Sequence, residues 1–224
     1  MKKILVILLA IICILPITGC TNDARKFKKE YEKLNGTTSS SGKEIRSINI
    51  DSDNPFVYKS ASDIVTMIKN EESFIVYFGF ASCPWCRSMV TNLIKAAKDT
   101  NTKTIYYVDV LEIRDTLALD DVGNVYREKD GDSYYMQLIS IMEDVLEDYT
   151  LTKDGKTIKT GEKRIYAPNV IAIKKGVAYD ITTGISNKQN DGYAELTDTI
   201  NEESYDMLKD LLSTFNGTCD EKAC

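Results

Sequence analysis

Two cysteines separated by two residues, Cys83 and Cys86, have the spacing of a reactive thiol pair. They follow an apolar run, Phe74–Phe80, and precede a segment of helical periodicity, so Cys83 is expected where a strand ends and a helix begins. Free backbone N–H groups and the helix dipole stabilise a thiolate at that position. We therefore expect thiol–disulfide exchange, in which Cys83 attacks a disulfide and Cys86, one helical turn later, resolves the mixed disulfide.

A static disulfide and half of a zinc site are the other common uses of a Cys-x-x-Cys motif. The chain contains no histidine, which excludes imidazole ligands and Cys-His nucleophilic catalysis. Zinc would then need four thiolates, with Cys219 and Cys224 as the second pair, and nothing in the sequence brings the C-terminal tail to Cys83. We predict no metal and no cofactor.

Cys219 and Cys224 lie in a polar C-terminal tail, residues 218–224. Their spacing permits a small closed loop, so a local disulfide is the expectation. The alternative is a second exchangeable pair that relays electrons between Cys83–Cys86 and a partner, because exposed disulfides are the more labile kind.

The N-terminal residues resemble a bacterial lipoprotein leader. Two lysines precede an apolar run, Ile4–Leu15, that is too short for a comfortable membrane span. The run ends in Ile17-Thr18-Gly19-Cys20, which resembles the lipobox. The resemblance implies that residues 1–19 are removed and that Cys20 carries lipid, which would anchor the protein to the outer face of a cell membrane. An uncleaved anchor and a soluble secreted protein are the alternatives.

Residues 20–44 are polar and rich in charge, glycine and serine, which predicts a flexible tether. The chain as a whole has 34 acidic and 28 basic residues, a balance that argues against nucleic acid as a partner. The remainder, 45–217, is long enough for one domain whose core does not depend on disulfides.

Strands and helices alternate in the apolar pattern from residue 45 onward. The run Phe74–Phe80 is apolar throughout, as in a central strand that is covered on both faces. Together with the helix after Cys83 and the next strand it predicts a βαβ unit. The predicted strands are Ile45–Ile50, Phe74–Phe80, Thr104–Val110 and the hairpin Val170–Ile173 with Val177–Ile181. The predicted helices are Ala61–Asn70, capped by Ser60 or Ser62, the segment after Cys83, Tyr134–Tyr149 and Glu202–Phe215. A hairpin turn is predicted at Lys153–Lys156.

The segment Phe78–Arg87 resembles the strand, active-site loop and helix of the thioredoxin superfamily. In that family a cis-proline loop faces the cysteines just before a β-hairpin, and Tyr166–Val170 occupies the corresponding position here. The resemblance implies a cis Ala167–Pro168 bond and an Ala167 backbone that pairs with an extended substrate. The residues implied to support the two cysteines are Pro84, Trp85, Ala167 and Pro168.

The implied fold is α/β, a thioredoxin-like three-layer fold with a mixed central sheet. This sequence departs from the family in two places. An insertion of about 40 residues, within 112–164, precedes the cis-proline loop. The other departure is Tyr77, where many family members carry a buried acid as a proton acceptor, so we expect water or a carboxylate such as Asp109 to take the Cys86 proton. Arg87 is expected to be a solvated helix residue.

Among family members the chain most resembles exported thioredoxin-like lipoproteins of Gram-positive bacteria, including bacteriocin transport accessory proteins. The implied function is extracytoplasmic thiol–disulfide exchange on exported proteins, with an unidentified redox partner and no fixed direction of electron flow. The alternative is a non-catalytic, membrane-tethered binding or chaperone module, because a thioredoxin scaffold alone does not establish catalysis.

Overall fold

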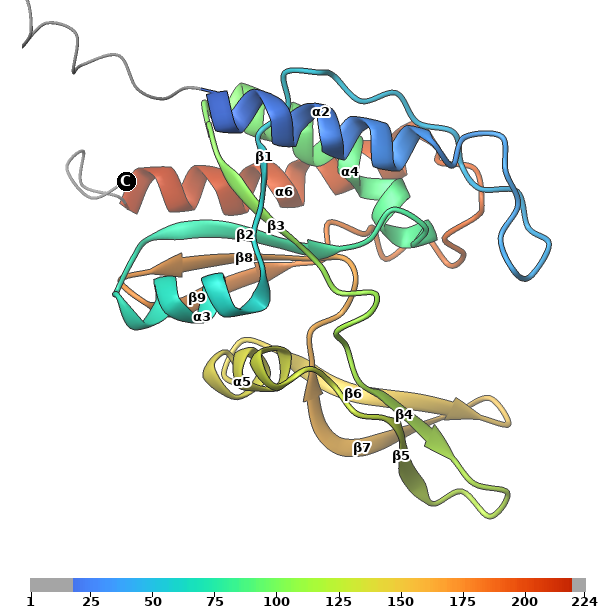
Figure 1. The fold of residues 1–224 in the computed structure, drawn as a ribbon. Coiled ribbons are helices and arrows are strands. Elements are labelled where there is room, and N and C mark those ends of the chain that lie inside the picture. Colours follow the sequence, from blue (N-terminus) through green and yellow to red (C-terminus); the bar gives the residue numbers. More distant parts are fainter. Residues whose placement is uncertain (1–17, 219–224) are drawn as a thin grey trace, which may run out of the picture.

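A mixed five-stranded sheet forms the centre of the protein in the computed structural model, which describes the backbone of residues 18–218 and the side chains of residues 22–217 (Figure 1). The strand order is β1-β3-β2-β8-β9. The first three strands are parallel, and β8 pairs antiparallel with both β2 and β9. The strands are β1 (Phe56–Tyr58), β2 (Phe74–Gly79), β3 (Ile105–Asp109), β8 (Asn169–Lys174) and β9 (Val177–Thr182).

Strand β2 lies in the middle of this sheet, and each of its six residues is buried. Val76 pairs with Tyr106 of β3 on one side and with Ile171 of β8 on the other. The continuous apolar run follows from this position, because a strand covered on both faces has no solvent side on which polar residues would be favoured. The prediction of a central strand is confirmed.

Helices cover both faces of the sheet and give the three layers that Figure 1 shows. Helix α4 (Pro84–Asp99) packs against α6 (Asp198–Thr218) on one face, and α3 (Ala61–Lys69) packs against α5 (Ser133–Ile141) on the other. Ser60 caps α3 in a complete capping box with Asp63, as one of the two predicted caps. No helix between residues 18 and 218 has the length and apolar character that a membrane span needs.

The insertion between β3 and β8 contains two antiparallel hairpins that flank α5. The first is β4 (Thr116–Leu119) with β5 (Val125–Lys129), and the second is β6 (Glu147–Lys153) with β7 (Lys156–Arg164). The predicted turn at Lys153–Lys156 is confirmed, with positive φ at Asp154 and Gly155. Helix α5 ends at Ile141, short of the predicted Tyr149, because Glu147–Lys153 pairs with β7 instead.

Buried Asp115 joins the two hairpins of the insertion. Its carboxylate accepts from Arg127 Nη1 at 2.8 Å and from Arg164 Nη1 at 3.2 Å, and Arg127 also pairs with Glu162 of β7. The side chains of Asp115 and Arg164 are only 2% and 9% exposed. This ion-pair network fixes β5 and β7 to the start of the insertion.

The predicted tether at residues 20–44 is wrong where the structure describes it. Helix α2 (Thr18–Glu32) packs on the core through Ala24, Phe27 and Tyr31, which are spaced three and four residues apart. The Phe27 ring stacks on Phe56 at 4.0 Å between centroids. The apolar face of this helix has only these three buried side chains among the described residues, and the charged residues around them conceal the pattern in the sequence.

The predicted strand at Ile45–Ile50 is also wrong, although Ile45, Ile48 and Ile50 are buried. Side chains near the end of α2 satisfy part of its backbone, where a strand would pair with a neighbouring strand. Asn35 exchanges two hydrogen bonds with the backbone of Ile48, and the Ile50 N–H donates to Glu32 at 2.8 Å. The edge strand is instead β1, at Phe56–Tyr58.

Candidate active site

Cys83 is the N-cap of α4, directly after the turn that follows β2. Pro84 occupies the first turn of this helix, where its missing N–H is tolerated. The Cys86 N–H donates to the Cys83 sulfur at 3.2 Å, so a sulfur takes the capping role that a hydroxyl or carboxylate oxygen usually has. Cys83 and Cys86 are free thiols that are 3% and 0% exposed. The predicted strand–turn–helix position of the pair is confirmed.

The two thiols differ in acidity. Burial opposes ionisation of Cys83, but hydrogen bonds from the Cys86 thiol and from the backbone N–H groups of Cys86 and Trp85, with the nearby Arg114 charge, hold its pKa below the ordinary value. Burial, followed by the hydrogen bond to Cys83 and the Cys83 charge, raises the pKa of Cys86 well above its ordinary value. This asymmetry is the one that an attacking and a resolving thiol need.

Arg114 is a member of the site that sequence reasoning missed. It lies at the start of the insertion, and its guanidinium stacks over the Phe80 ring at 4.7 Å from the centroid. Phe80 accepts the Cys83 N–H through its carbonyl, so Arg114 is placed beside the active-site turn. No motif marks this arginine, because only the path of the chain after β3 brings it to Cys83.

The Ala167–Pro168 peptide bond is cis, as predicted. The Cys83 thiol donates to the Ala167 carbonyl at 3.2 Å, which places the loop against the attacking sulfur. Asn169 secures the loop: its side chain accepts from the Tyr166 N–H at 2.6 Å, and its backbone pairs with Phe78 of β2. The structure therefore brings together Cys83 and Ala167, which lie 84 residues apart.

A surface hollow of about 390 Å³ adjoins the cis-proline loop. Trp85 lines it together with Ala167, Pro168 and Ile185, and Glu147 contributes from the insertion. The chain approaches Trp85 closely at Gly192, where an added Cβ would lie 3.2 Å from Trp85 Cδ2. Trp85 is thus partly buried but keeps one side on the hollow next to the cysteines.

Arg87 is not the solvated residue that the sequence suggested. It is 1% exposed, and its guanidinium donates only to neutral acceptors. These are the carbonyls of Tyr31 (2.9 Å), Arg46 (2.7 Å) and Ala81 (3.0 Å) and the Asn35 side-chain oxygen (2.7 Å). Arg87 therefore ties the end of α2 and the following segment to the turn that carries Cys83.

The Tyr77 hydroxyl lies beside the Cys86 sulfur, and its hydrogen-bonding interaction opposes the rise in the Cys86 pKa that burial causes. Asp109, the carboxylate suggested as an acceptor for the Cys86 proton, instead faces Glu30 and accepts from the Leu111 N–H at 2.9 Å. The structure thus places a tyrosine hydroxyl beside the resolving sulfur. Cys219 and Cys224 lie outside the described residues, as do residues 1–17 of the predicted leader, and Cys20 lies in the first turns of α2.

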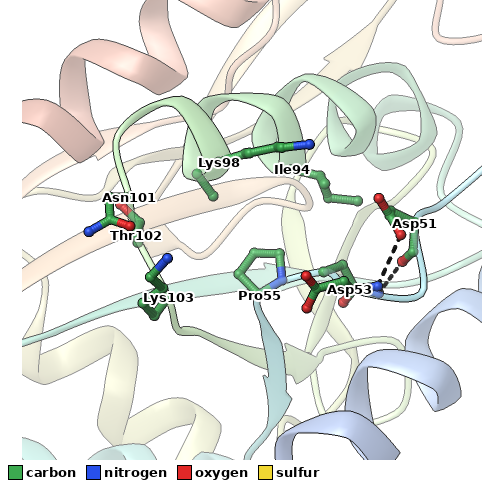
Figure 2. A pocket seen from close by; sticks show the side chains of 10 residues that line it. Asp51, Asp53, Pro55, Ile94, Lys98, Asn101, Thr102 and Lys103 are labelled. Atoms are coloured by element: carbon green, nitrogen blue, oxygen red, sulfur yellow. Dashed lines mark hydrogen bonds between the residues drawn. The ribbon is translucent and has the colours of Figure 1, made fainter.

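Another hollow, of about 260 Å³, lies at the far end of α4 from Cys83 (Figure 2). Figure 2 shows Asp51 and Asp53 on one side of it and Lys103 on the other, with Lys98 and Ile94 of α4 along its edge. None of the ten residues that line it is a cysteine, so it is separate from the thiol chemistry.

The chain matches no protein-family model and no curated protein. Only the geometry therefore points to a type of chemistry. A Cys-x-x-Cys pair at the start of a helix, in which the pKa of the first thiol is lowered, is compatible with redox activity.

Proposed function

We propose that this protein is a thioredoxin-like thiol–disulfide oxidoreductase that acts on cysteines of exported proteins. The observation that carries the proposal is the position of Cys83, whose sulfur caps α4 and contacts the Ala167 carbonyl of the cis-proline loop. The mixed five-stranded sheet, with helices on both faces, is consistent with the thioredoxin-like topology. The direction of electron flow depends on the reduction potential of the Cys83–Cys86 pair.

The exchange needs two displacements at sulfur. The Cys83 thiolate attacks a substrate disulfide, forms a mixed disulfide and releases one substrate sulfur as a thiolate. Cys86 then attacks the Cys83 sulfur, which forms the Cys83–Cys86 disulfide, breaks the mixed disulfide and releases the second substrate sulfur. Oxidation of a substrate dithiol is the same sequence in reverse. The lowered pKa of Cys83 favours the attacking form at neutral pH.

The surface beside Cys83 suits an extended polypeptide segment. The Ala167 backbone lies at the sulfur, and the hollow lined by Trp85, Pro168 and Ile185 offers apolar contacts next to it. When an extended chain binds in this way, backbone hydrogen bonds supply affinity and side-chain contacts supply specificity. We propose exported proteins with free or mispaired cysteines as the substrates, and the room for an extended chain beside Cys83 supports this.

Trapping tests the proposal. In Cys86→Ala the resolving thiol is gone, so attacked substrates should accumulate as covalent adducts that a reducing agent removes and that mass spectrometry identifies. The control is Cys83→Ala combined with Cys86→Ala, which should form no adducts. Absence of adducts, together with insulin reduction and ribonuclease refolding at uncatalysed rates, would contradict the enzyme function and leave the binding module. A measured Cys83–Cys86 potential separates an oxidant from a reductant.

Export and lipidation at Cys20 complete the proposal, and the lipobox-like Ile17-Thr18-Gly19-Cys20 supports them. Ala24, the first residue of α2 that packs on the core, follows Cys20 by four residues, about 6 Å along a helix axis. A lipid on Cys20 would therefore hold the folded domain close to the membrane surface. In membrane fractionation, Cys20→Ala should move to the soluble fraction; unchanged processing and retention would refute the anchor.

A further inference from the structure

Two tyrosines lie in the core beneath the resolving cysteine. Tyr31 of α2 and Tyr77 of β2 are both 0% exposed, and their hydroxyl oxygens are 2.9 Å apart. The Tyr77 hydroxyl also lies next to the Cys86 sulfur, where its hydrogen-bonding interaction opposes the rise in the Cys86 pKa that burial causes. The three polar groups thus form a continuous buried chain from the N-terminal helix to the active site.

Which group donates in each of these hydrogen bonds follows from the number of O–H protons on the two tyrosines. A phenol has one O–H to donate. Tyr77 donates to the Cys86 sulfur, so its oxygen accepts the hydrogen bond from Tyr31. The chain therefore runs Tyr31 to Tyr77 to Cys86, and each donor is polarised by the one before it.

Both tyrosines are donors and not bases. Burial raises the pKa of Tyr31 and of Tyr77 well above the ordinary value, so both remain protonated at neutral pH. Neither can take the Cys86 proton in the way that a buried carboxylate would.

Other polar groups near Tyr31, Tyr77 and Cys86 belong to α4, to β3 and to the turn between β2 and α4. They are the Cys83 thiol of α4, the Phe80 backbone, the Tyr107 hydroxyl of β3 and the Arg87 guanidinium, 6.0 Å from the Tyr31 ring centroid. Among these described groups there is no carboxylate. The two contacts that oppose the rise in the pKa of the resolving thiol are hydrogen bonds from the Tyr77 hydroxyl and the Phe80 backbone.

We propose that Tyr77 is a catalytic residue for the release step, as the donor that stabilises the Cys86 sulfur while it becomes a thiolate, and that Tyr31 positions it. The inference rests on the proposed function. In the release step the Cys86 S–H loses its proton, the Cys83–Cys86 bond forms and the Cys83–substrate bond breaks. The proton goes to the departing substrate sulfur when that thiolate is basic, and to solvent when it is not, as with thionitrobenzoate, so the step needs no buried base.

A small chromogenic disulfide isolates this step. Ellman's reagent converts the Cys83 thiolate into a mixed disulfide with thionitrobenzoate, and attack by Cys86 then releases the second thionitrobenzoate. Stopped-flow absorbance separates the two releases. Tyr77→Phe should slow the second release about tenfold, the value of one hydrogen bond to a charged sulfur, and leave the first unchanged. It should also shift the pH dependence of the second release to higher pH, because the Cys86 thiolate loses its donor.

Tyr107→Phe is the matched control, because Tyr107 is equally buried and its hydroxyl has no hydrogen-bond partner. It should leave both releases unchanged. Tyr31→Phe should slow the second release less than Tyr77→Phe, and the double variant should be no slower than Tyr77→Phe. Thermal unfolding of each variant checks folding, and Tyr31→Phe keeps the test available if Tyr77→Phe does not fold.

An unchanged second release and pH profile in Tyr77→Phe would overturn this inference, as would an equal slowing in Tyr107→Phe. Failure of the proposed function gives a different result. In that case wild-type Cys83 forms no mixed disulfide, or forms one that Cys86 never resolves.

Discussion

Replacing Arg87 by methionine tests whether one buried guanidinium holds the N-terminal helix to the active-site turn. Methionine fills a similar apolar volume but cannot donate hydrogen bonds. In the variant four acceptors lose the hydrogen bond from Arg87, and two of these, the Tyr31 and Ala81 carbonyls, are bonded to Arg87 in buried surroundings. The Arg46 carbonyl and Asn35 are partly buried and can reach water more easily.

The expected loss follows from these contacts. An unsatisfied buried acceptor costs about 1–3 kcal/mol, so two cost about 2–6 kcal/mol. The Tyr31 carbonyl keeps a weaker bond from the Leu34 N–H at 3.3 Å, and removal of a buried charge recovers part of the desolvation penalty. We expect a net loss of about 3 kcal/mol in the free energy of unfolding, a large share of the roughly 5–15 kcal/mol of a typical domain.

Urea unfolding measures this loss. The single tryptophan, Trp85, reports on the active-site turn, and circular dichroism reports on the whole fold. With a urea slope of about 3 kcal/mol/M, the midpoint should fall by about 1 M. Lys98→Met, at an exposed position of the same helix, is the control and should leave the midpoint unchanged. A loss below about 1 kcal/mol in Arg87→Met would refute the reasoning.

Three further predictions concern the surroundings of the site. Arg114→Gln removes a positive charge near Cys83, so the pKa of that thiol should rise and its alkylation by iodoacetamide at neutral pH should slow; unchanged alkylation would contradict the placement. Asp115→Ala leaves buried Arg164 unpaired and should cost about 3–5 kcal/mol in urea unfolding, with new protease cleavage within residues 112–164; a resistant insertion would argue against the network. Ser60→Ala removes the N-cap of α3 and should cost about 1 kcal/mol, whereas Ser60→Gly should cost less.

The thiol site could be predicted because its signals are local. The Cys-x-x-Cys spacing, the apolar strand before it and the helical periodicity after it together locate Cys83 at a helix start, and the structure has it there. The cis bond at Ala167–Pro168 also agrees with what the family resemblance implied, and that resemblance depended on the position of Pro168 just before a hairpin.

The surroundings of the site could not be predicted in the same way. Arg87 is itself a charged residue, and Tyr31 lies in a charged segment, so composition alone favours solvent exposure for both. Their burial depends on partners far along the chain, since Arg87 contacts Tyr31 from 56 residues away and Tyr31 meets Tyr77 across 46. The predicted tether at residues 20–44 was wrong for the same reason.

The sequence by itself determined the reactive pair, the central strand β2, the helix α4 and the final hairpin β8–β9, because each depends on residues that are neighbours along the chain. Only the tertiary structure decided what surrounds Cys86, since burial and hydrogen bonding are properties of residues that meet in space. It brought Tyr31 of α2 to Tyr77 and placed Asp109 beside Glu30. Packing therefore sets the pKa of the resolving thiol, whereas the Cys-x-x-Cys motif shows which cysteine it is.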